Sequence, residues 1–173
     1  SHAKALQSLA EWLKIQQIPA VTGIDTRSLI LKIRQQGKML GKIVHAGQEI
    51  EHYDPDLVHV VDQVSTKKPI QYGKGKLKIL LIDCGVKRSI IKAFTDRDCS
   101  VLVLPWNSGF LEENYDALVI SNGPGNPENC QIIIERLQKA VTKNIPILGI
   151  CLGHQLLGMA IGLPINRLTY GHR

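Results

Sequence analysis

The stretch Ile147-Leu-Gly-Ile-Cys-Leu-Gly-His-Gln-Leu156 decides the fold of the second half of this 173-residue chain. It begins after Pro146 as a short apolar run, which is typical of a buried strand. From Leu152 onward, apolar residues recur at spacings of four, the period of one helix face. Cys151 therefore stands where a strand turns into a helix, with a glycine two residues away on each side. This G-x-C-x-G arrangement is the thiol counterpart of the G-x-S-x-G nucleophile elbow.

Cys151 has the surroundings expected of a catalytic nucleophile. Gly149 and Gly153 leave its side chain uncrowded at the tip of the turn, and the helix N-terminus favours thiolate over thiol. The amide of Leu152 points to where an oxyanion would form, and Gln155 lies one helical turn from the sulfur. The alternative is a buried structural cysteine ahead of a core helix. The two glycines, the strand before them and the helix after them favour the nucleophile.

The histidines are not predicted to be the catalytic base or metal ligands. His154 is three residues from Cys151, but a base normally approaches the sulfur from another loop, so a packed or hydrogen-bonded helix histidine is predicted. His45, His52 and His59 recur at intervals of seven, yet no predicted helix connects them. They are interpreted as scattered surface histidines.

The composition is that of a globular protein, with 44% hydrophobic and 21% charged residues. No apolar run has membrane-spanning length, and no signal-peptide pattern is present. The four cysteines form no C-x-x-C pair, so we expect neither a metal site nor a disulfide framework, and we expect a cytoplasmic location. The formal charge of +6 comes mostly from scattered residues, so nucleic-acid binding is not expected. One basic cluster stands out (Lys67, Lys68, Lys74, Lys76 and Lys78).

Residues 1–66 are predicted to be part of a small α+β domain. The pattern indicates a helix over about 3–17 and a second one capped by Asp25 or Thr26 and ended by Gly37. A strand is expected from Met39 to Val44. The second helix is predicted to turn three apolar residues inward (Leu29, Ile30 and Ile33).

A segment rich in Lys, Gly and Pro, residues 67–76, is predicted to be a linker to residues 77–173. Beyond it, short apolar strands alternate with helices, which predicts an α/β fold with a parallel sheet and helices on both faces. Ligands bind such sheets at the carboxyl ends of the strands. The strands are expected over 77–82, 101–104, 117–120 and about 146–150, and the helices over about 88–96, 130–142 and from 152 onward.

The loop Ser121-Asn-Gly-Pro-Gly-Asn-Pro127 follows one strand end and is expected beside the elbow. Its glycines permit a positive φ and close approach of a ligand, while each proline fixes its own φ. The amide of Gly123 is a candidate second oxyanion donor, together with that of Leu152. A tight turn without a ligand stays open as the alternative. A phosphate loop is disfavoured, because neither common phosphate-binding glycine motif is present.

The two motifs together resemble those of the class I, triad-type glutamine amidotransferases, whose domain is flavodoxin-like. Three further segments resemble the small, glutamine-hydrolysing subunit of carbamoyl-phosphate synthase (Gly23-Ile-Asp-Thr-Arg27, Gly37-Lys-Met-Leu-Gly-Lys-Ile-Val44 and Asp83-Cys-Gly-Val-Lys87). The resemblance runs from about Ser8 to Arg173. Other amidotransferases of this class would not be expected to carry the first third.

This resemblance implies that Cys151 attacks the side-chain amide of L-glutamine and forms a glutamyl thioester. It implies oxyanion-hole amides from Gly123 and Leu152, and glutamine contacts from these residues, Gly125 and Gln155. Ammonia would pass to a large synthetase subunit, which uses ATP, Mg²⁺ and bicarbonate to make carbamoyl phosphate for arginine and pyrimidine synthesis. No cofactor is expected on this chain.

The sequence departs from the family in one respect. The family's base belongs to a His-x-Glu element that this chain does not contain, and His172 is not at that position. Both domains are therefore expected to be truncated, and the segment alone is expected to be inactive. Three alternatives stay open: a cysteine hydrolase of the same architecture, an amidotransferase that serves another synthetase, and a non-catalytic binding or regulatory piece.

Overall fold

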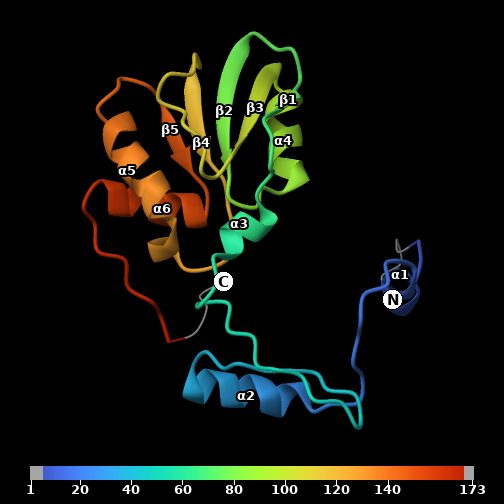
Figure 1. Ribbon diagram of the computed structural model, residues 1–173. Coiled ribbons are helices and arrows are strands. Elements are labelled where there is room, and N and C mark those ends of the chain that lie inside the picture. Colours follow the sequence, from blue (N-terminus) through green and yellow to red (C-terminus); the bar gives the residue numbers. More distant parts are fainter. Residues whose placement is uncertain (1–5, 170–173) are drawn as a thin grey trace. The chain divides into compact units, whose positions relative to one another are not determined.

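The computed structural model describes residues 6–169. The chain divides into two compact units, one formed by Ser1–Gly41 with Leu168–Arg173 and the other by Lys42–Arg167. Among the described residues, the first unit contains two helices, and the second contains the sheet and the remaining helices (Figure 1). None of the helices within residues 6–169 is long and apolar enough to cross a membrane.

The helices of the first unit begin at side-chain caps. Helix α1 (Leu9–Ile15) starts at Ser8, which forms a capping box with Glu11. Helix α2 (Thr26–Gln36) starts at Asp25, whose carboxylate accepts the Ser28 amide at 2.9 Å. Asp25 is thus the cap, and Gly37 ends α2 with a φ of 81°. The predicted helix over about 3–17 is shorter at both ends, and its first residues lie outside the described part.

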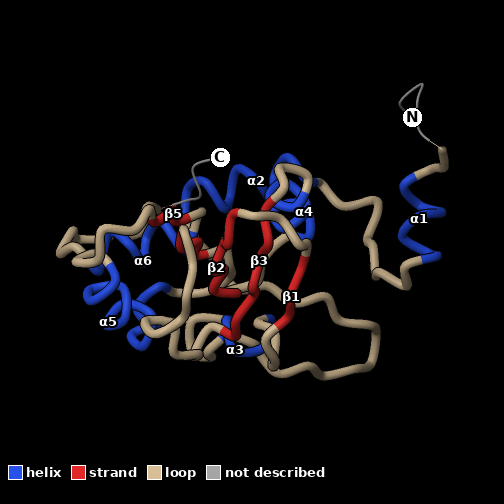
Figure 2. Tube along the Cα trace, turned by 90° about the horizontal axis from the view of Figure 1, so that it is seen from above, coloured by secondary structure: helices blue, strands red, loops and turns tan. Residues whose placement is uncertain are grey.

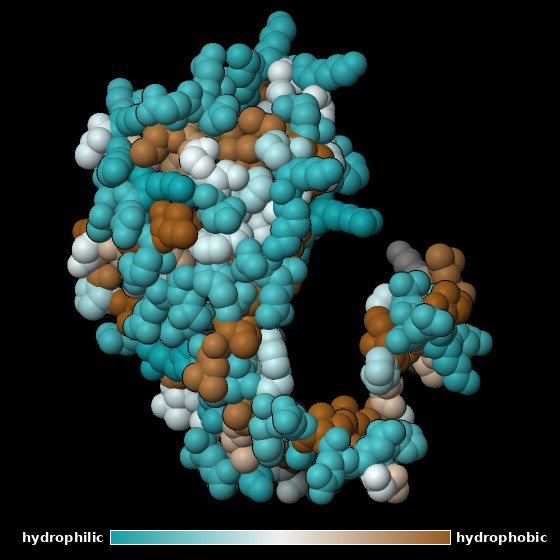
Figure 3. Space-filling model, viewed as in Figure 1, coloured by the Kyte–Doolittle hydropathy of each residue, from teal (hydrophilic) through white to brown (hydrophobic). Residues whose placement is uncertain are grey.

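Two predictions for the first third of the chain are wrong. The segment Met39 to Val44 forms no strand, because no other described strand pairs with it. The apolar stripe of α2 does not face inward within the described residues. Figure 3 shows apolar surface over this helix. The three residues predicted to be inside are all exposed (Leu29 47%, Ile30 56% and Ile33 38%).

The second unit is built on a five-stranded sheet with the order β1-β3-β2-β4-β5 within the described residues. Strands β2 to β5 run parallel to their neighbours, whereas β1 pairs antiparallel with β3. Figure 2 shows the strands side by side. The four strands predicted between residues 77 and 150 are confirmed, with ends that differ by at most two residues. The five strands are β1 (Ile70–Tyr72), β2 (Leu77–Asp83), β3 (Cys99–Pro105), β4 (Ala117–Ile120) and β5 (Ile147–Gly149).

Helices cover both faces of the sheet, as predicted (Figure 1). Successive strand residues point to opposite faces, so each face has its own apolar core. Helix α4 (Arg88–Thr95) packs on one core, and α5 (Gln131–Ala140) and α6 (Leu152–Ala160) pack on the other. The first core includes Ile79, Leu81, Ile91, Val101 and Val119, and the second includes Leu80, Ile82, Leu118, Ile133, Leu137 and Leu156.

Three short elements were not predicted. Strand β1 lies within the segment expected to be a linker, and all three of its residues are exposed at the sheet edge. Such a short, exposed edge strand has too few residues to show a period. Helix α3 (Val60–Val64) precedes it. The predicted helix over 130–142 begins instead with a 3-10 turn, η1 (Pro127–Cys130), which leads into α5.

Candidate active site

Cys151 occupies a strained turn between β5 and α6. Its backbone has a φ of 52° and a ψ of −107°, a conformation that residues with a Cβ rarely adopt. Such a residue costs on the order of 1–3 kcal/mol and persists only where the surrounding structure holds it, most often at active sites. The side chain is exposed. This is the strand-turn-helix geometry that presents the nucleophile in an elbow.

The two elbow glycines are required by backbone packing. A Cβ at Gly153 would lie 2.1 Å from the carbonyl oxygen of Ile120, at the end of β4. A Cβ at Gly149 would lie 2.5 Å from the carbonyl oxygen of Gly153. Both distances are far below van der Waals contact, so no larger residue fits without a backbone shift. The sequence-based explanation was different: it attributed the glycines to the need for an uncrowded Cys151 side chain.

Hydrogen bonds join the elbow to the start of the glycine loop. The amide of Ile150 donates to Ile120 O at 3.0 Å, and the amide of Gly153 donates to Ser121 O at 3.1 Å. Ser121 is fully buried, and its hydroxyl accepts the Cys84 amide at 2.9 Å and donates to Asn122 O at 2.8 Å. The carboxyl ends of β2, β4 and β5 are therefore tied together at this edge, as the sequence predicts.

The glycine loop is held between the segment after β2 and helix α3. A Cβ at Gly123 would lie 2.2 Å from Cys84 O, so only glycine allows this approach. Gly125 has a φ of 91°, and a Cβ there would meet the Val60 side chain at 3.5 Å. The Asn122 side chain donates to Gly85 O at 3.0 Å. These contacts fix both glycines that were predicted to bind glutamine, although their roles stay predictions.

The other two predicted site residues lie on α6. Leu152 is its first residue, with a buried side chain, and its amide has no acceptor among the backbone hydrogen bonds of the described residues. The first amides of a helix lack partners within the helix and can bind an external oxygen. Gln155 is half-buried, and its backbone amide donates to Cys151 O at 3.2 Å. Gln155 therefore lies one helical turn after Cys151.

The remaining cysteines are unsuited to nucleophilic attack. Cys84, Cys99 and Cys130 are buried, whereas Cys151 is exposed. Burial raises the pKa of the Cys84 thiol well above its usual range, and it raises the pKa of Cys130 to about 11. Both stay protonated at neutral pH, and only a thiolate is a strong nucleophile. No group of three metal-ligating side chains was found within residues 6–169.

His154 is exposed on α6, and no hydrogen bond of its side chain is seen within residues 6–169, so the prediction of a packed or hydrogen-bonded histidine is wrong. Packing fails because its position on the helix points away from the sheet-facing residues Leu152 and Leu156, which are buried. His172 lies outside the described residues. His45 and His52 are exposed, as predicted.

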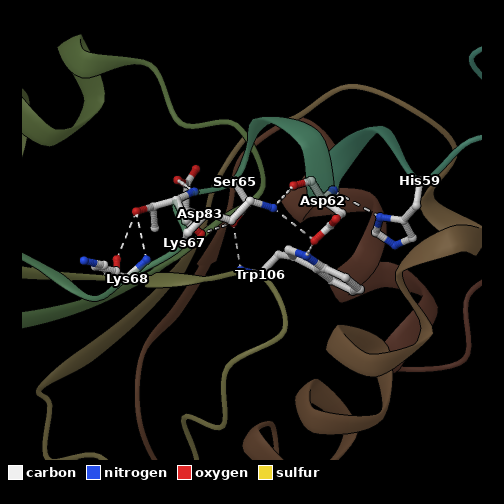
Figure 4. A network of polar contacts seen from close by, with 8 residues as sticks. His59, Asp62, Ser65, Lys67, Lys68, Asp83 and Trp106 are labelled. Atoms are coloured by element: carbon white, nitrogen blue, oxygen red, sulfur yellow. Dashed lines mark hydrogen bonds and ion pairs between the residues drawn. The ribbon is translucent and has the colours of Figure 1, made fainter.

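His59 is not a scattered surface histidine. It is the N-cap of α3, where its Nδ1 accepts the Asp62 amide at 3.1 Å. Its Nε2 lies 2.7 Å from Asn129 O, which requires the proton on Nε2. Its ring also stacks on Trp106, with centroids 4.2 Å apart (Figure 4). No local pattern predicts the contacts with Asn129 and Trp106, because these partners are distant in the sequence.

A polar network continues from His59 along α3 to the strand ends (Figure 4). The Trp106 indole donates to the Asp62 carboxylate at 2.9 Å. This hydrogen bond, and then that from Lys67, holds the pKa of Asp62 below its usual range. Asp83, at the end of β2, is buried and accepts the Thr66 amide at 2.8 Å. The network joins the segment before the sheet to the site edge.

Comparison with known families agrees with this geometry. A family model described as Glutamine amidotransferase class-I matches residues 80–173, and one described as Carbamoyl-phosphate synthase small chain, CPSase domain, matches residues 1–43. The first match covers more than half of the chain and includes both motifs. The chain belongs to the class-I glutamine amidotransferase family. Its first residues are additionally similar to the carbamoyl-phosphate synthase small chain.

Three curated relatives are similar over the whole chain. The multifunctional protein CAD of Squalus acanthias is 44% identical, and this chain covers 8% of its length. The arginine-specific carbamoyl phosphate synthase small chain of Saccharomyces cerevisiae is 42% identical, with 45% covered. The mitochondrial carbamoyl-phosphate synthase [ammonia] of Aquarana catesbeiana is 42% identical, with 12% covered. The chain thus spans less than half the length of each of these relatives.

Proposed function

We propose that this chain carries the nucleophile of a glutaminase site that supplies ammonia for carbamoyl phosphate synthesis. The observation that carries the proposal is the strained, exposed Cys151 on an elbow bonded to the start of the glycine loop. The match to the small chain of carbamoyl-phosphate synthase and the name of the Saccharomyces cerevisiae relative support the choice of product. A cysteine hydrolase without an ammonia acceptor has no comparable support.

In the proposed reaction, the Cys151 sulfur bonds to the side-chain amide carbon of L-glutamine. The amide C–N bond breaks, and the nitrogen leaves as ammonia after taking up the thiol proton. Water then hydrolyses the glutamyl thioester to glutamate and the free thiol. The amides of Gly123 and Leu152 would stabilise the oxyanion at each step, and Gly125 and Gln155 would help to hold glutamine.

The ammonia would pass to a large synthetase component. That component would use ATP with Mg²⁺ and bicarbonate, so no cofactor is proposed for this chain. We propose a reducing, cytoplasmic compartment, because the reaction needs a free thiol and all four cysteines are unpaired.

One specific observation favours a second candidate function. A relative of this chain is named as an ammonia-type synthase, so similarity along the sequence does not by itself imply the use of glutamine. The chain would then be a non-catalytic part of a synthetase. Among the described residues, His59 hydrogen-bonds to Asn129 and Asp62, and no histidine hydrogen-bonds to the Cys151 side chain, which is consistent with either candidate.

Labelling of the thiol by a chloroketone analogue of glutamine distinguishes the two candidates. We expect mass spectrometry to find one label on Cys151, slowed by added glutamine and absent from Cys151→Ser. The test is run on the chain alone and on the assembled synthetase. Labelling in the assembled enzyme alone would mean that the glutamine pocket needs residues from outside this chain. Absence of glutamine-blocked labelling in both preparations would exclude a glutaminase site and favour the non-catalytic part.

A further inference from the structure

We propose that His59 is a positioning residue, which clamps helix α3 against the glycine loop and so aligns the oxyanion and glutamine-binding amides with Cys151. This inference rests on the proposed function, because it assigns a role to α3 in the same site. Helix α3 lies before the sheet in the sequence and contains neither of the family's two motifs, the glycine loop and the elbow.

The first observation is that α3 touches the glycine loop directly. Val60, which follows His59, lies against Gly125: a Cβ there would be 3.5 Å from Val60 Cβ. At its other end, Val64 lies against Gly85, where a Cβ would be 3.0 Å from Val64 Cγ2 and 3.2 Å from Pro124. Helix α3 therefore lies against the loop at Gly125, and its other end lies against Gly85, which in turn is next to Pro124.

The second observation is that His59 bridges α3 to the turn that follows the loop. Its Nδ1 caps α3 by accepting the Asp62 amide, and its Nε2 donates to Asn129 O in η1. A single ring thus joins the two elements between which Gly125 lies. Neutral histidine with the proton on Nε2 satisfies both bonds at once, and no other side chain offers an acceptor and a donor at this separation in a rigid ring.

The third observation is that the ring of His59 is itself fixed. It stacks on Trp106, whose indole donates to Asp62 and whose amide donates to the buried Ser65 hydroxyl at 2.9 Å (Figure 4). The Thr66 amide donates to Asp83 at the end of β2. The bridge is therefore anchored to the carboxyl ends of β2 and β3, the same edge that carries the site.

A clamp of this kind is needed because the backbone of the glycine loop is not restrained by a side chain at Gly125. Gly125 has a positive φ and no side chain, so the loop backbone has more freedom than most residues allow. Oxyanion donors act only if they are held at the correct distance before the reaction starts. A misplacement of about 1 Å by a change outside the reacting groups can cost roughly 100-fold in rate.

Two variants separate the bridge from the helix cap. His59→Ala removes both hydrogen bonds and the stacking on Trp106. His59→Asn keeps a favoured N-cap acceptor for the Asp62 amide, but it has neither the second ring nitrogen that reaches Asn129 nor the aromatic ring. His52→Ala, at an exposed histidine seven residues earlier, is the matched control. Urea midpoints show whether each variant folds.

The rates at which two reagents label Cys151 are compared. The preparation used, the chain alone or the assembled synthetase, is the one in which the wild-type protein shows glutamine-blocked labelling. The chloroketone analogue of glutamine needs the aligned loop, whereas iodoacetamide needs only the exposed thiol. We expect His59→Ala and His59→Asn to lower the chloroketone rate about tenfold or more. The iodoacetamide rate should stay within about twofold of wild type, since the elbow itself is unchanged. His52→Ala should change neither rate.

Three results would overturn the inference. Unchanged chloroketone rates in both folded variants would show that the loop needs no bridge. If His59→Asn reacted with the chloroketone at the wild-type rate while His59→Ala reacted more slowly, His59 would act only as a helix cap. Equal losses with both reagents would mean general damage to the elbow. Failure of the proposed function is recognised separately, because the wild-type protein would then show no glutamine-blocked labelling at all.

Discussion

Replacing Gly153 by alanine tests whether the elbow depends on backbone contact with β4. The new Cβ would lie 2.1 Å from Ile120 O, and ordinary contact begins at 3.4 Å, so the groups must separate by 3.4 − 2.1 = 1.3 Å. Such overpacking costs about 1–3 kcal/mol. The shift also removes the hydrogen bond from Gly153 to Ser121, worth about 1 kcal/mol. Alanine restores about 1 kcal/mol of helix propensity. We expect a net loss of about 1–3 kcal/mol in the free energy of unfolding.

Gly158→Ala is the matched control, because it makes the same change in the same helix. A Cβ there meets only Ile165 Cδ1 at 3.5 Å, an ordinary contact. Higher helix propensity should therefore stabilise the protein by about 0.5–1 kcal/mol. Urea unfolding followed by circular dichroism gives both values, and native-state iodoacetamide labelling of Cys151 reports on the elbow. Equal unfolding midpoints for Gly153→Ala and Gly158→Ala would refute the explanation of the elbow glycines.

Two further predictions concern the core of the sheet unit. Burial raises the pKa of the Cys130 thiol from 9.0 to about 11, so the folded chain keeps a proton that the unfolded chain has already lost. The free energy of unfolding should therefore be unaffected by this thiol below pH 9 and should fall as the pH rises toward 11. In Cys130→Ala it should fall less steeply over the same range. Identical slopes of the free energy of unfolding against pH, measured by urea titration of both proteins, would contradict this. Leu156→Ala, at a fully buried position, should lower the free energy of unfolding by about 2–5 kcal/mol. Ile161→Ala, at a residue that is 57% exposed, should cost much less, and equal urea midpoints would argue against this placement of α6.

The α/β half of the chain was predictable from local patterns. Strands buried on both faces are continuous apolar runs. The run from Leu77 to Ile82 is interrupted only by Lys78, and it is bounded by a glycine-containing segment before it and Asp83 after it. The order of strand and helix around Cys151 could likewise be derived from spacing alone. The backbone angles of Cys151, a φ of 52° and a ψ of −107°, were not predicted from the sequence.

The contacts that support the site could not be predicted, because they join residues far apart in the sequence. His59 and Asn129 are separated by 70 residues, and Asp62 and Trp106 by 44. Strand β1 is recognisable only through its pairing with β3. The prediction that the apolar face of α2 points inward was wrong for a related reason. A helical apolar period shows which face is apolar, but not whether a second layer covers it.

Three glycines of the candidate site are best understood as meeting points of backbone segments rather than as sources of flexibility. Gly123, Gly149 and Gly153 each place a missing Cβ within 2.5 Å of a carbonyl oxygen, and these oxygens belong to the segment after β2, the first turn of α6 and the end of β4. The strain at Cys151 needs this packing, because a residue with that φ and ψ stays in place only when its neighbours cannot relax. A change of the nucleophile to serine would thus keep the geometry and lose the thiol chemistry. A side chain at any of the three glycines would do the reverse: it would leave the thiol intact and release the turn that presents it.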